Sequence, residues 1–148
     1  MSVDSYFDAA SEYACRRLVN DFAEFIDARQ YERLRELFTA DAVYTRPTVP
    51  DTEIRGIEAI ISGFQSRPPT RMTQHLLTNV SIRFTSCDAA SGVNRIVLYA
   101  GVTTDPELPG KGRKAEPSQL IGLYRDRYVR STAGWRIAER RGSVLLHT

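Results

Sequence analysis

The chain has 148 residues, of which 42% are hydrophobic and 26% charged, as is typical of one globular domain with its own core. No apolar run approaches the ~18 residues of a membrane span, and the acidic first residues do not resemble a secretory signal. We therefore expect a cytoplasmic protein without membrane contact, in which Cys15 and Cys87 are free thiols.

The formal net charge is +2, but the two halves of the chain differ in sign. Residues 1–70 carry 12 acidic and 8 basic side chains, whereas residues 71–148 carry 6 acidic and 12 basic ones. The basic residues form no continuous run and are not interleaved with a row of aromatics, so we expect no nucleic-acid partner. We expect instead that acidic helices lie against a basic sheet, or that the sheet face joins subunits.

Helical periodicity dominates the first half of the chain. Apolar residues recur at spacings of three and four from Ser11 to Asp27, which predicts a helix with one buried stripe. A second, short helix is expected to turn Tyr31 and Leu34 inward, and a third is expected from Gly56 to the Pro68-Pro69 pair. Between them we predict a short strand over residues 42–46 and a loop over residues 47–50.

From residue 73 onward the pattern changes to a period of two, which is typical of strands. Strands are predicted over residues 73–85, 93–104, 119–130 and 135–146, with turns at 88–92 and 131–134 and a loop at 105–117. Short turns between strands imply an antiparallel meander. Three helices followed by this meander predict an α+β domain whose long curved sheet wraps around the helices and leaves a pocket.

One of the two histidines, His75, lies near the start of the first long strand. Strict alternation predicts that His75, Leu77 and Asn79 share one face, because successive side chains of a strand point to opposite faces. Histidine is the natural proton carrier near neutral pH. The sequence contains no phosphate-loop, dinucleotide or metal-ligand spacing, so neither a cofactor nor a metal is expected.

Other side chains are candidates to assist His75. Asp27 lies at the last turn of the first helix and can orient an imidazole, or it can simply bond backbone N–H groups of the next turn. Four tyrosines lie on or beside strands and can polarise a carbonyl, although most such tyrosines are core or interface aromatics: Tyr44, Tyr99, Tyr124 and Tyr128. Arg46 ends a strand, where it can reach a pocket mouth or remain solvated.

Three stretches together resemble the SnoaL-like branch of the NTF2-like superfamily, which includes scytalone dehydratase, ketosteroid isomerase, limonene epoxide hydrolase and polyketide cyclases. The first runs from Phe25 to Tyr44 and holds the helix-to-strand passage with Leu-Phe-Thr-Ala-Asp-Ala. The second is the Thr-Gln-His entry within residues 71–79, similar to that of scytalone dehydratase. The third is the closing hairpin over residues 122–141.

This resemblance implies that residues 1–148 form a single NTF2-like cone, in which three helices pack into a strongly curved, mostly antiparallel mixed sheet around an apolar pocket. It implies a homo-oligomer, a dimer or trimer, and it places Asp27 and His75 at the positions of a catalytic aspartate–histidine pair. Two departures stand out. No second histidine falls near residues 103–105, and Gln30 replaces the second aspartate of the helix motif.

Our leading hypothesis from the sequence is therefore a cofactor-independent lyase or isomerase acting on a small, apolar, cyclic or aromatic carbonyl compound. His75 would be the acid/base and Asp27 its orienting partner. The substrate would be bound by Tyr44, Arg46, Leu77, Asn79 and Tyr99. The alternative is a non-catalytic binding protein or a subunit that builds oligomers, similar to the β subunit of ring-hydroxylating dioxygenases. An epoxide hydrolase is the third possibility.

Overall fold

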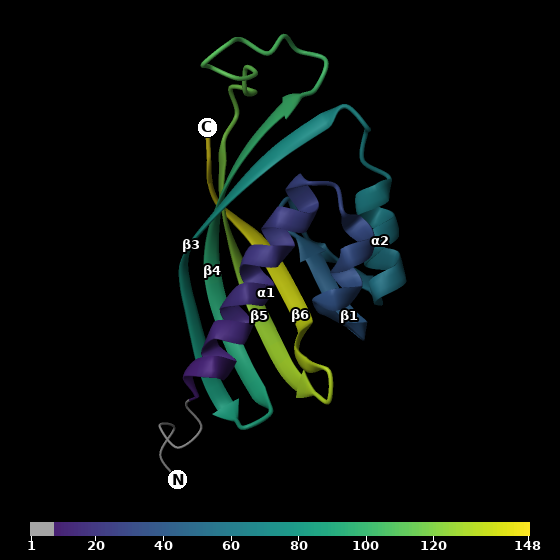
Figure 1. Cartoon of the computed structure of the whole chain (residues 1–148), viewed down its shortest axis with the longest axis vertical. Coiled ribbons are helices and arrows are strands. Elements are labelled where there is room, and N and C mark those ends of the chain that lie inside the picture. Colours follow the sequence, from purple (N-terminus) through teal and green to yellow (C-terminus); the bar gives the residue numbers. More distant parts are fainter. Residues whose placement is uncertain (1–7) are drawn as a thin grey trace.

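The computed structural model describes residues 8–148 as an α+β fold in which one curved sheet wraps around the helices (Figure 1). The helices are α1 (Ala9–Asp27), the 3₁₀-helix η2 (Tyr31–Glu36) and α2 (Ile57–Gln65). The strands are β1 (Phe38–Arg46), β2 (Val49–Arg55), β3 (Arg71–Ser86), β4 (Ala89–Val102), β5 (Leu120–Ser131) and β6 (Gly134–His147). Helix α1 lies diagonally across one face of the sheet, and α2 lies beyond β1.

The six strands form one sheet in the order β2-β1-β6-β5-β4-β3. Strands β3, β4, β5 and β6 form an antiparallel meander, and β1 extends the sheet by pairing parallel to β6 and antiparallel to β2. The predicted meander and the predicted mostly antiparallel mixed sheet are both confirmed. This order brings β1, from the first third of the chain, beside the C-terminal strand β6, so both ends of the described chain contribute to one core.

Helix α1 is fixed at both of its ends. The Asp8 carboxylate accepts hydrogen bonds from the backbone N–H groups of Ala10 and Ser11, at 3.1 and 3.3 Å, which caps the start of the helix. At the other end, Arg29 takes a left-handed conformation with φ 57° and stops the helix. The buried stripe of α1 faces the sheet and consists of Ser11, Cys15, Leu18, Val19, Phe22, Ala23, Phe25 and Ile26. Asp27 therefore lies on the last turn, at the edge of this stripe.

Two local predictions are wrong. Strand β1 begins at Phe38 rather than at residue 42, and the expected loop over residues 47–50 is the turn of a β1–β2 hairpin. Strand β2 is almost fully exposed and contains Pro50, Asp51 and Glu53, so it carries neither the alternation nor the β-branched composition of a buried strand. The three expected helices are present as two α-helices and one 3₁₀-helix.

The predicted unbroken alternation along β3 is also wrong, because a β-bulge interrupts the strand. The register with β4 shifts between Thr78 and Ser81, and Asn79 within this step has φ 52°. Asparagine tolerates the left-handed region better than most residues. Past the bulge the phase reverses, so that Val80 and Ile82 pack against the core whereas Asn79 is exposed. Asn79 therefore does not share the inward face of His75.

A buried polar network lies beneath α1, between β4, β5 and β6. Asp126 Oδ2 accepts three hydrogen bonds, from Asn94 at 2.9 Å, from Tyr128 at 2.8 Å and from Arg140 Nη1 at 2.9 Å. The Arg140 guanidinium is fully buried and lies 4.4 and 4.1 Å from the ring centroids of Phe22 and Tyr124. Burial raises the pKa of the Asp126 carboxyl, and Arg140 opposes that rise.

The two cysteines lie in different environments, which predicts different reactivity. Cys15 is buried in the core and Cys87 is exposed in the β3–β4 turn. Burial, assisted by the charge of Glu12, raises the pKa of the Cys15 thiol to about 12. At pH 8 Ellman's reagent should therefore titrate one thiol in the folded protein and two in guanidinium chloride, because the thiolate is the reactive form. The Cys87→Ser variant should show none when folded, and two fast native thiols would contradict the burial of Cys15.

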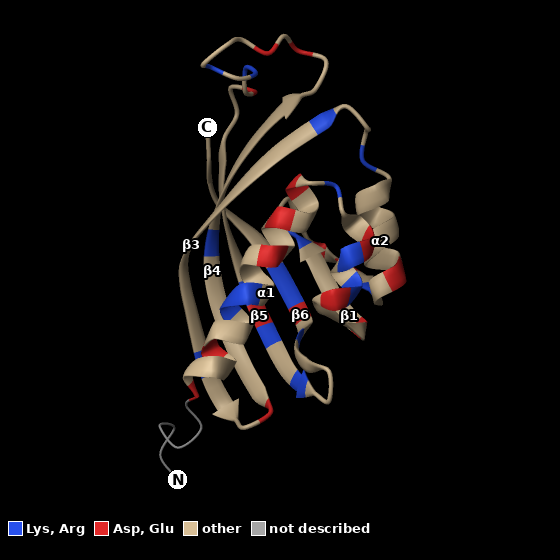
Figure 2. Ribbon diagram, viewed as in Figure 1, with Lys and Arg blue, Asp and Glu red and all other residues tan. Residues whose placement is uncertain are grey.

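The charge asymmetry of the sequence has a spatial counterpart (Figure 2). Acidic residues gather on the C-terminal half of α1, at Asp21, Glu24 and Asp27, while β5 and β6 carry most of the basic residues of the sheet. Within the described part of the chain, no helix is both long enough and apolar enough to cross a membrane.

Candidate active site

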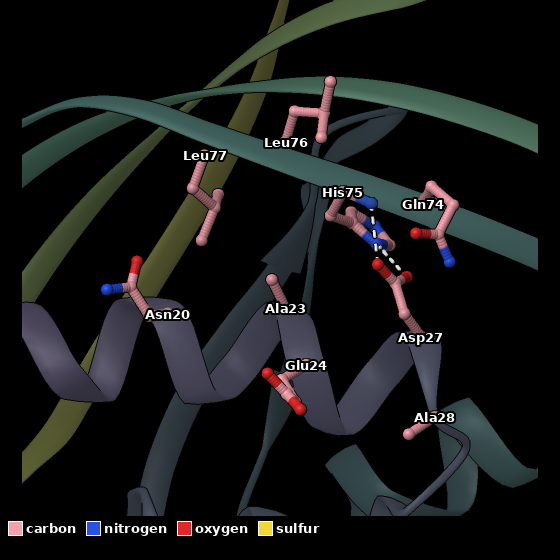
Figure 3. A pocket seen from close by; sticks show the side chains of 9 residues that line it. All are labelled: Asn20, Ala23, Glu24, Asp27, Ala28, Gln74, His75, Leu76 and Leu77. Carbon is pink, nitrogen blue, oxygen red and sulfur yellow. Dashed lines mark hydrogen bonds and ion pairs between the residues drawn. The ribbon is translucent and has the colours of Figure 1, made fainter.

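Asp27 and His75 are in direct contact between the end of α1 and the first half of β3 (Figure 3). His75 Nδ1 lies 2.5 Å from Asp27 Oδ1, and the backbone N–H of His75 donates to Asp27 Oδ2 at 2.7 Å. Both side chains are shielded from solvent, with 7% of His75 and 15% of Asp27 exposed. The contact joins two positions 48 residues apart in the chain, so it exists only when α1 is docked on the sheet.

The Asp27 carboxylate is held by more than the imidazole. The hydroxyl of Thr73, two residues before His75 and on the same face of β3, donates to Asp27 Oδ1 at 2.9 Å. The carboxylate is therefore fixed by two donors of β3 besides the imidazole ring, namely the Thr73 hydroxyl and the His75 backbone N–H. The position of the carboxylate does not depend on the imidazole that it orients.

This geometry defines the tautomer of His75. A carboxylate can only accept, so in the neutral imidazole the proton that faces Asp27 lies on Nδ1. Nε2 is then the nitrogen that can take a proton, and no other described residue forms a hydrogen bond with it. The pair is thus arranged as a base oriented by a carboxylate.

The His75 ring lines two hollows. One is an open groove of about 600 Å³ between α1 and β3, bordered by Asn20, Glu24 and Gln74 (Figure 3). The other is a more enclosed cavity of about 80 Å³ that reaches inward from His75. Proton transfer to and from carbon benefits from exclusion of water, so we take the inner cavity as the candidate site.

The inner cavity combines apolar walls with a few polar groups. Its apolar lining consists of Phe22, Phe64, Ile96, Leu98 and Leu120, together with Pro47. Its polar lining consists of His75, Tyr44, Tyr124, Arg46, Arg67 and Thr48. The structure therefore places predicted residues Tyr44 and Arg46 around the same cavity as His75.

Tyr44 and Tyr124 form a pair of buried phenols at this cavity. Their hydroxyl oxygens lie 3.1 Å apart, and burial raises the pKa of each tyrosine above its ordinary value. Both hydroxyls therefore stay protonated at neutral pH. Two protons are present and only one is used between the rings, so the second can be donated to an oxygen of a bound molecule.

The two arginines come from different elements. Arg46 ends β1, and its Nη2 donates to the backbone carbonyl of Gly63 in α2 at 2.7 Å. Arg67 follows α2, and its guanidinium lies 4.6 Å from the ring centroid of Phe64. Burial lowers the pKa of the Arg67 guanidinium, although no carboxylate is needed to keep it charged.

Three residues predicted to bind substrate lie elsewhere. Leu77 points toward α1 and lines the open groove rather than the inner cavity (Figure 3). Asn79 is exposed at the bulge, as described above. Tyr99 pairs with Gln74 across β3 and β4 and lies on the opposite face of the sheet, beside Met72 and the loop at Arg113. The assignments of Asn79 and Tyr99 to the His75 pocket are therefore wrong.

Sequence reasoning left three contributors out of the predicted site, although Tyr124 was one of the strand tyrosines considered. Thr73 has the same strand face as His75, so period-two spacing was a usable signal. Tyr124 shares a face with Asp126 and Tyr128, and an acid in the middle of an apolar strand face marks a buried polar network. Arg67 lies in the loop after α2, where no periodicity applies and only the three-dimensional structure places it.

Among residues 8–148, no group of three His, Cys, Asp or Glu side chains comes together in a way that could hold a metal ion. The site consists of protein acids, bases and hydrogen-bond donors.

Solved structures with this fold carry the names of several different activities. A hexachlorocyclohexane dehydrochlorinase of type 2 matches with a TM-score of 0.77 at 22% identity, over 94% of this chain and 88% of that one. A candidate scytalone dehydratase from Novosphingobium aromaticivorans matches with a TM-score of 0.73 at 22% identity, over 94% and 87%. A candidate aromatic ring hydroxylase from the same organism matches with a TM-score of 0.76 at 19% identity, over 95% and 92%. At these identities the matches show the fold.

No curated protein matches the chain. The model of the SnoaL-like domain, however, matches residues 8–141, which is nearly the whole described structure. The strand order, the curved mixed sheet and the matched range agree with the resemblance seen in the sequence. The chain therefore belongs to the SnoaL-like family of the NTF2-like superfamily.

Proposed function

We propose that the protein is a cofactor-independent lyase or isomerase that transfers a proton next to the carbonyl group of a small cyclic or aromatic compound. The observation that carries this proposal is the His75–Asp27 contact at 2.5 Å, with His75 also lining an inner cavity that combines apolar walls with hydrogen-bond donors. An oriented imidazole at the wall of a cavity is the arrangement that general acid–base catalysis requires.

In this mechanism His75 Nε2 removes a proton from the carbon next to the carbonyl. The electron pair of the broken C–H bond moves to the carbonyl oxygen, and the free hydroxyl proton of the Tyr44–Tyr124 pair stabilises the developing negative charge. The imidazolium is stabilised by Asp27. It then returns its proton either to another carbon, which gives isomerisation, or to a leaving hydroxyl, which gives elimination of water.

The test is a solvent-exchange screen that needs no knowledge of the natural substrate. Cyclic ketones and cyclic hydroxyketones are incubated with the protein in deuterated buffer, and loss of the proton next to the carbonyl is followed by NMR. We expect exchange or elimination above the buffer rate for members of the panel that fit the cavity. A panel with no acceleration, using protein that is folded by circular dichroism, would refute the proposal.

A second candidate function is a non-catalytic binding protein or oligomer-building subunit. The small volume of the inner cavity, about 80 Å³ against the ~300–1,000 Å³ of typical ligand sites, favours the oligomer-building subunit of these two. The epoxide hydrolase hypothesis gains no support, because the residues that line the cavity include no carboxylate.

We further propose that the chain forms a homo-oligomer through the outer face of its sheet. Leu76, Val97, Ile121 and Leu146 lie directly opposite one another on β3, β4, β5 and β6. Leu76 and Leu146 are 57% and 65% exposed, so this apolar row faces away from the core. Light scattering should show a dimer or trimer that Leu76→Asp dissociates, and a wild-type monomer would contradict the proposal.

The two free cysteines support a reducing, cytoplasmic location.

A further inference from the structure

The inner cavity holds two guanidinium groups and no counter-charge. Arg46 and Arg67 both contribute to its lining, and no aspartate or glutamate does. Among the described residues neither arginine lies within 4.0 Å of a carboxylate, whereas Arg16, Arg33, Arg127 and Arg140 each do. The two carboxylates next to residues of the lining already have partners: Asp27 binds His75 and Thr73, and Asp126 binds Arg140, Asn94 and Tyr128.

The donors of these arginines are only partly used. Arg46 makes one side-chain hydrogen bond, to the carbonyl of Gly63, and its buried Nε has no partner in the described structure. Arg67 lies over the Phe64 ring, and burial and the like charge of Arg46 both lower its pKa. A buried or half-buried cation is costly unless it is paired, so two of them facing one cavity indicate an anionic ligand.

Helix α2 has a glycine, Gly63, where the Arg46 guanidinium packs against it. Gly63 faces the end of Arg46, and a Cβ atom at this position would lie 3.2 Å from Arg46 Nη2. The missing side chain lets the guanidinium lie against the helix and its carbonyl. The position of Arg46 is therefore set by local packing even when no anion is bound.

We propose that Arg46 and Arg67 bind the carboxylate of a small organic acid in the inner cavity. Resting on the proposed function above, this makes the substrate a carbonyl compound that also carries a carboxylate, rather than a wholly apolar one. The carboxylate would accept hydrogen bonds from the two guanidinium groups, and the carbon next to the carbonyl would lie toward His75. Binding energy from a part of the molecule that does not react would thus position the reacting carbon.

The experiment compares acids with their neutral isosteres. Propionate and benzoate, each against its own amide, are titrated into the protein in 150 mM sodium chloride, and affinities are taken from ¹H–¹⁵N NMR shifts. We expect each acid that binds to bind about tenfold or more tightly than its amide, the size expected for hydrogen bonds to charged groups. The side-chain Nε–Hε signals of Arg46 and Arg67 should shift with the acid and not with the amide.

Variants locate the effect. Arg67→Met and Arg46→Met are expected to remove the preference for the acid, and Arg67→Lys should keep part of it, because the charge remains. Arg130→Met, at the exposed end of β5, is the matched control and should leave the preference unchanged. Arg67 is only partly buried and forms no ion pair within the described residues, so its variant should fold even where Arg46→Met does not.

The outcomes separate this inference from the proposed reaction. Equal affinity for acids and amides, no binding of either, or a preference that survives Arg67→Met would overturn the carboxylate site. His75→Ala should retain the preference for the acid, because His75 is not one of the two arginines that supply it. A clear preference for acids without any proton exchange would support the carboxylate site and refute the proposed reaction. Proton exchange of neutral ketones without a preference for acids would support the reaction and refute the carboxylate site.

Discussion

Replacing His75 by Gln is expected to lower the rate of proton exchange by ~10²–10⁴-fold, the range that a positioned general base contributes. Glutamine keeps a polar side chain next to Asp27, but it has no nitrogen that can take a proton near neutral pH. The substrate found in the exchange screen supplies the assay, with kcat and KM measured separately. A rate within a few-fold of wild type would remove His75 from the mechanism.

Asp27→Asn should produce a loss of similar order by a different route. The carboxylate accepts from three donors, namely the Thr73 hydroxyl, the His75 backbone N–H and His75 Nδ1. The carboxamide of asparagine has one acceptor oxygen, so at least one of these donors then faces an NH₂ group, and the imidazole is no longer held in its tautomer. An unpaired buried donor also costs ~1–3 kcal/mol of stability.

Asp21→Asn is the matched control for Asp27→Asn. Asp21 lies on the same helix, and its carboxylate pairs only with Arg17 at the surface, at 3.3 Å. Its replacement should change neither the rate nor the melting temperature by more than a small amount. If both variants lost activity equally, the net charge of the helix rather than the contact with His75 would explain the effect.

The largest effect on stability is expected at the buried ion pair. Arg140→Met leaves the Asp126 carboxylate without its only cation inside the core, and breaking a buried pair in this way costs ~3–5 kcal/mol. For a chain of this size that lowers the melting temperature by roughly 10 °C or more. Thermal unfolding followed by circular dichroism measures the change.

The neighbouring positions on the same two strands form an exposed ion pair of arginine and a carboxylate, which serves as a control. Asp126 pairs with Arg140 across β5 and β6, and the adjacent pair is Arg127 with Glu139, which faces outward. Arg127→Met should cost less than ~1 kcal/mol, as exposed ion pairs do. Equal costs for the two variants would show that Arg140 is not a buried partner of Asp126.

A double variant tests how the network is coupled. Arg140→Met combined with Asp126→Leu removes both charges, so it should recover part of the stability lost in Arg140→Met alone. Recovery should be incomplete, because Asn94 and Tyr128 each lose a partner that no apolar side chain replaces.

The sequence could predict those parts of the fold that local periodicity determines. The stripe of α1 and the four long strands follow from spacing alone, and they were found within a few residues of their ends. Strand β2 was missed because an exposed edge strand has no buried face to impose alternation. The bulge at Asn79 was missed because a single left-handed residue leaves no mark on composition.

The candidate site was predictable only where a resemblance joined distant segments. No spacing rule brings Asp27 and His75 together over 48 residues, and the family resemblance supplied that pairing. Asn79 was assigned to the pocket by strand phase, which changes at the bulge. Tyr99 was assigned because it is a tyrosine on a strand, and its strand position places it on the other face of the sheet. Arg67 has no pattern at all, since its position depends on how the loop after α2 folds back over Phe64.

The bulge in β3 also limits how this chain can change over evolutionary time. Before the bulge the odd-numbered side chains of β3, such as His75, face inward. After it the even-numbered ones, Val80 and Ile82, face inward. Deleting Asn79, or inserting one residue beside it, would expose either the base or the apolar half of the strand. Descendants of this sequence can therefore exchange the outward-facing side chains of β3, but gains and losses of length are better tolerated in connecting segments such as residues 103–119.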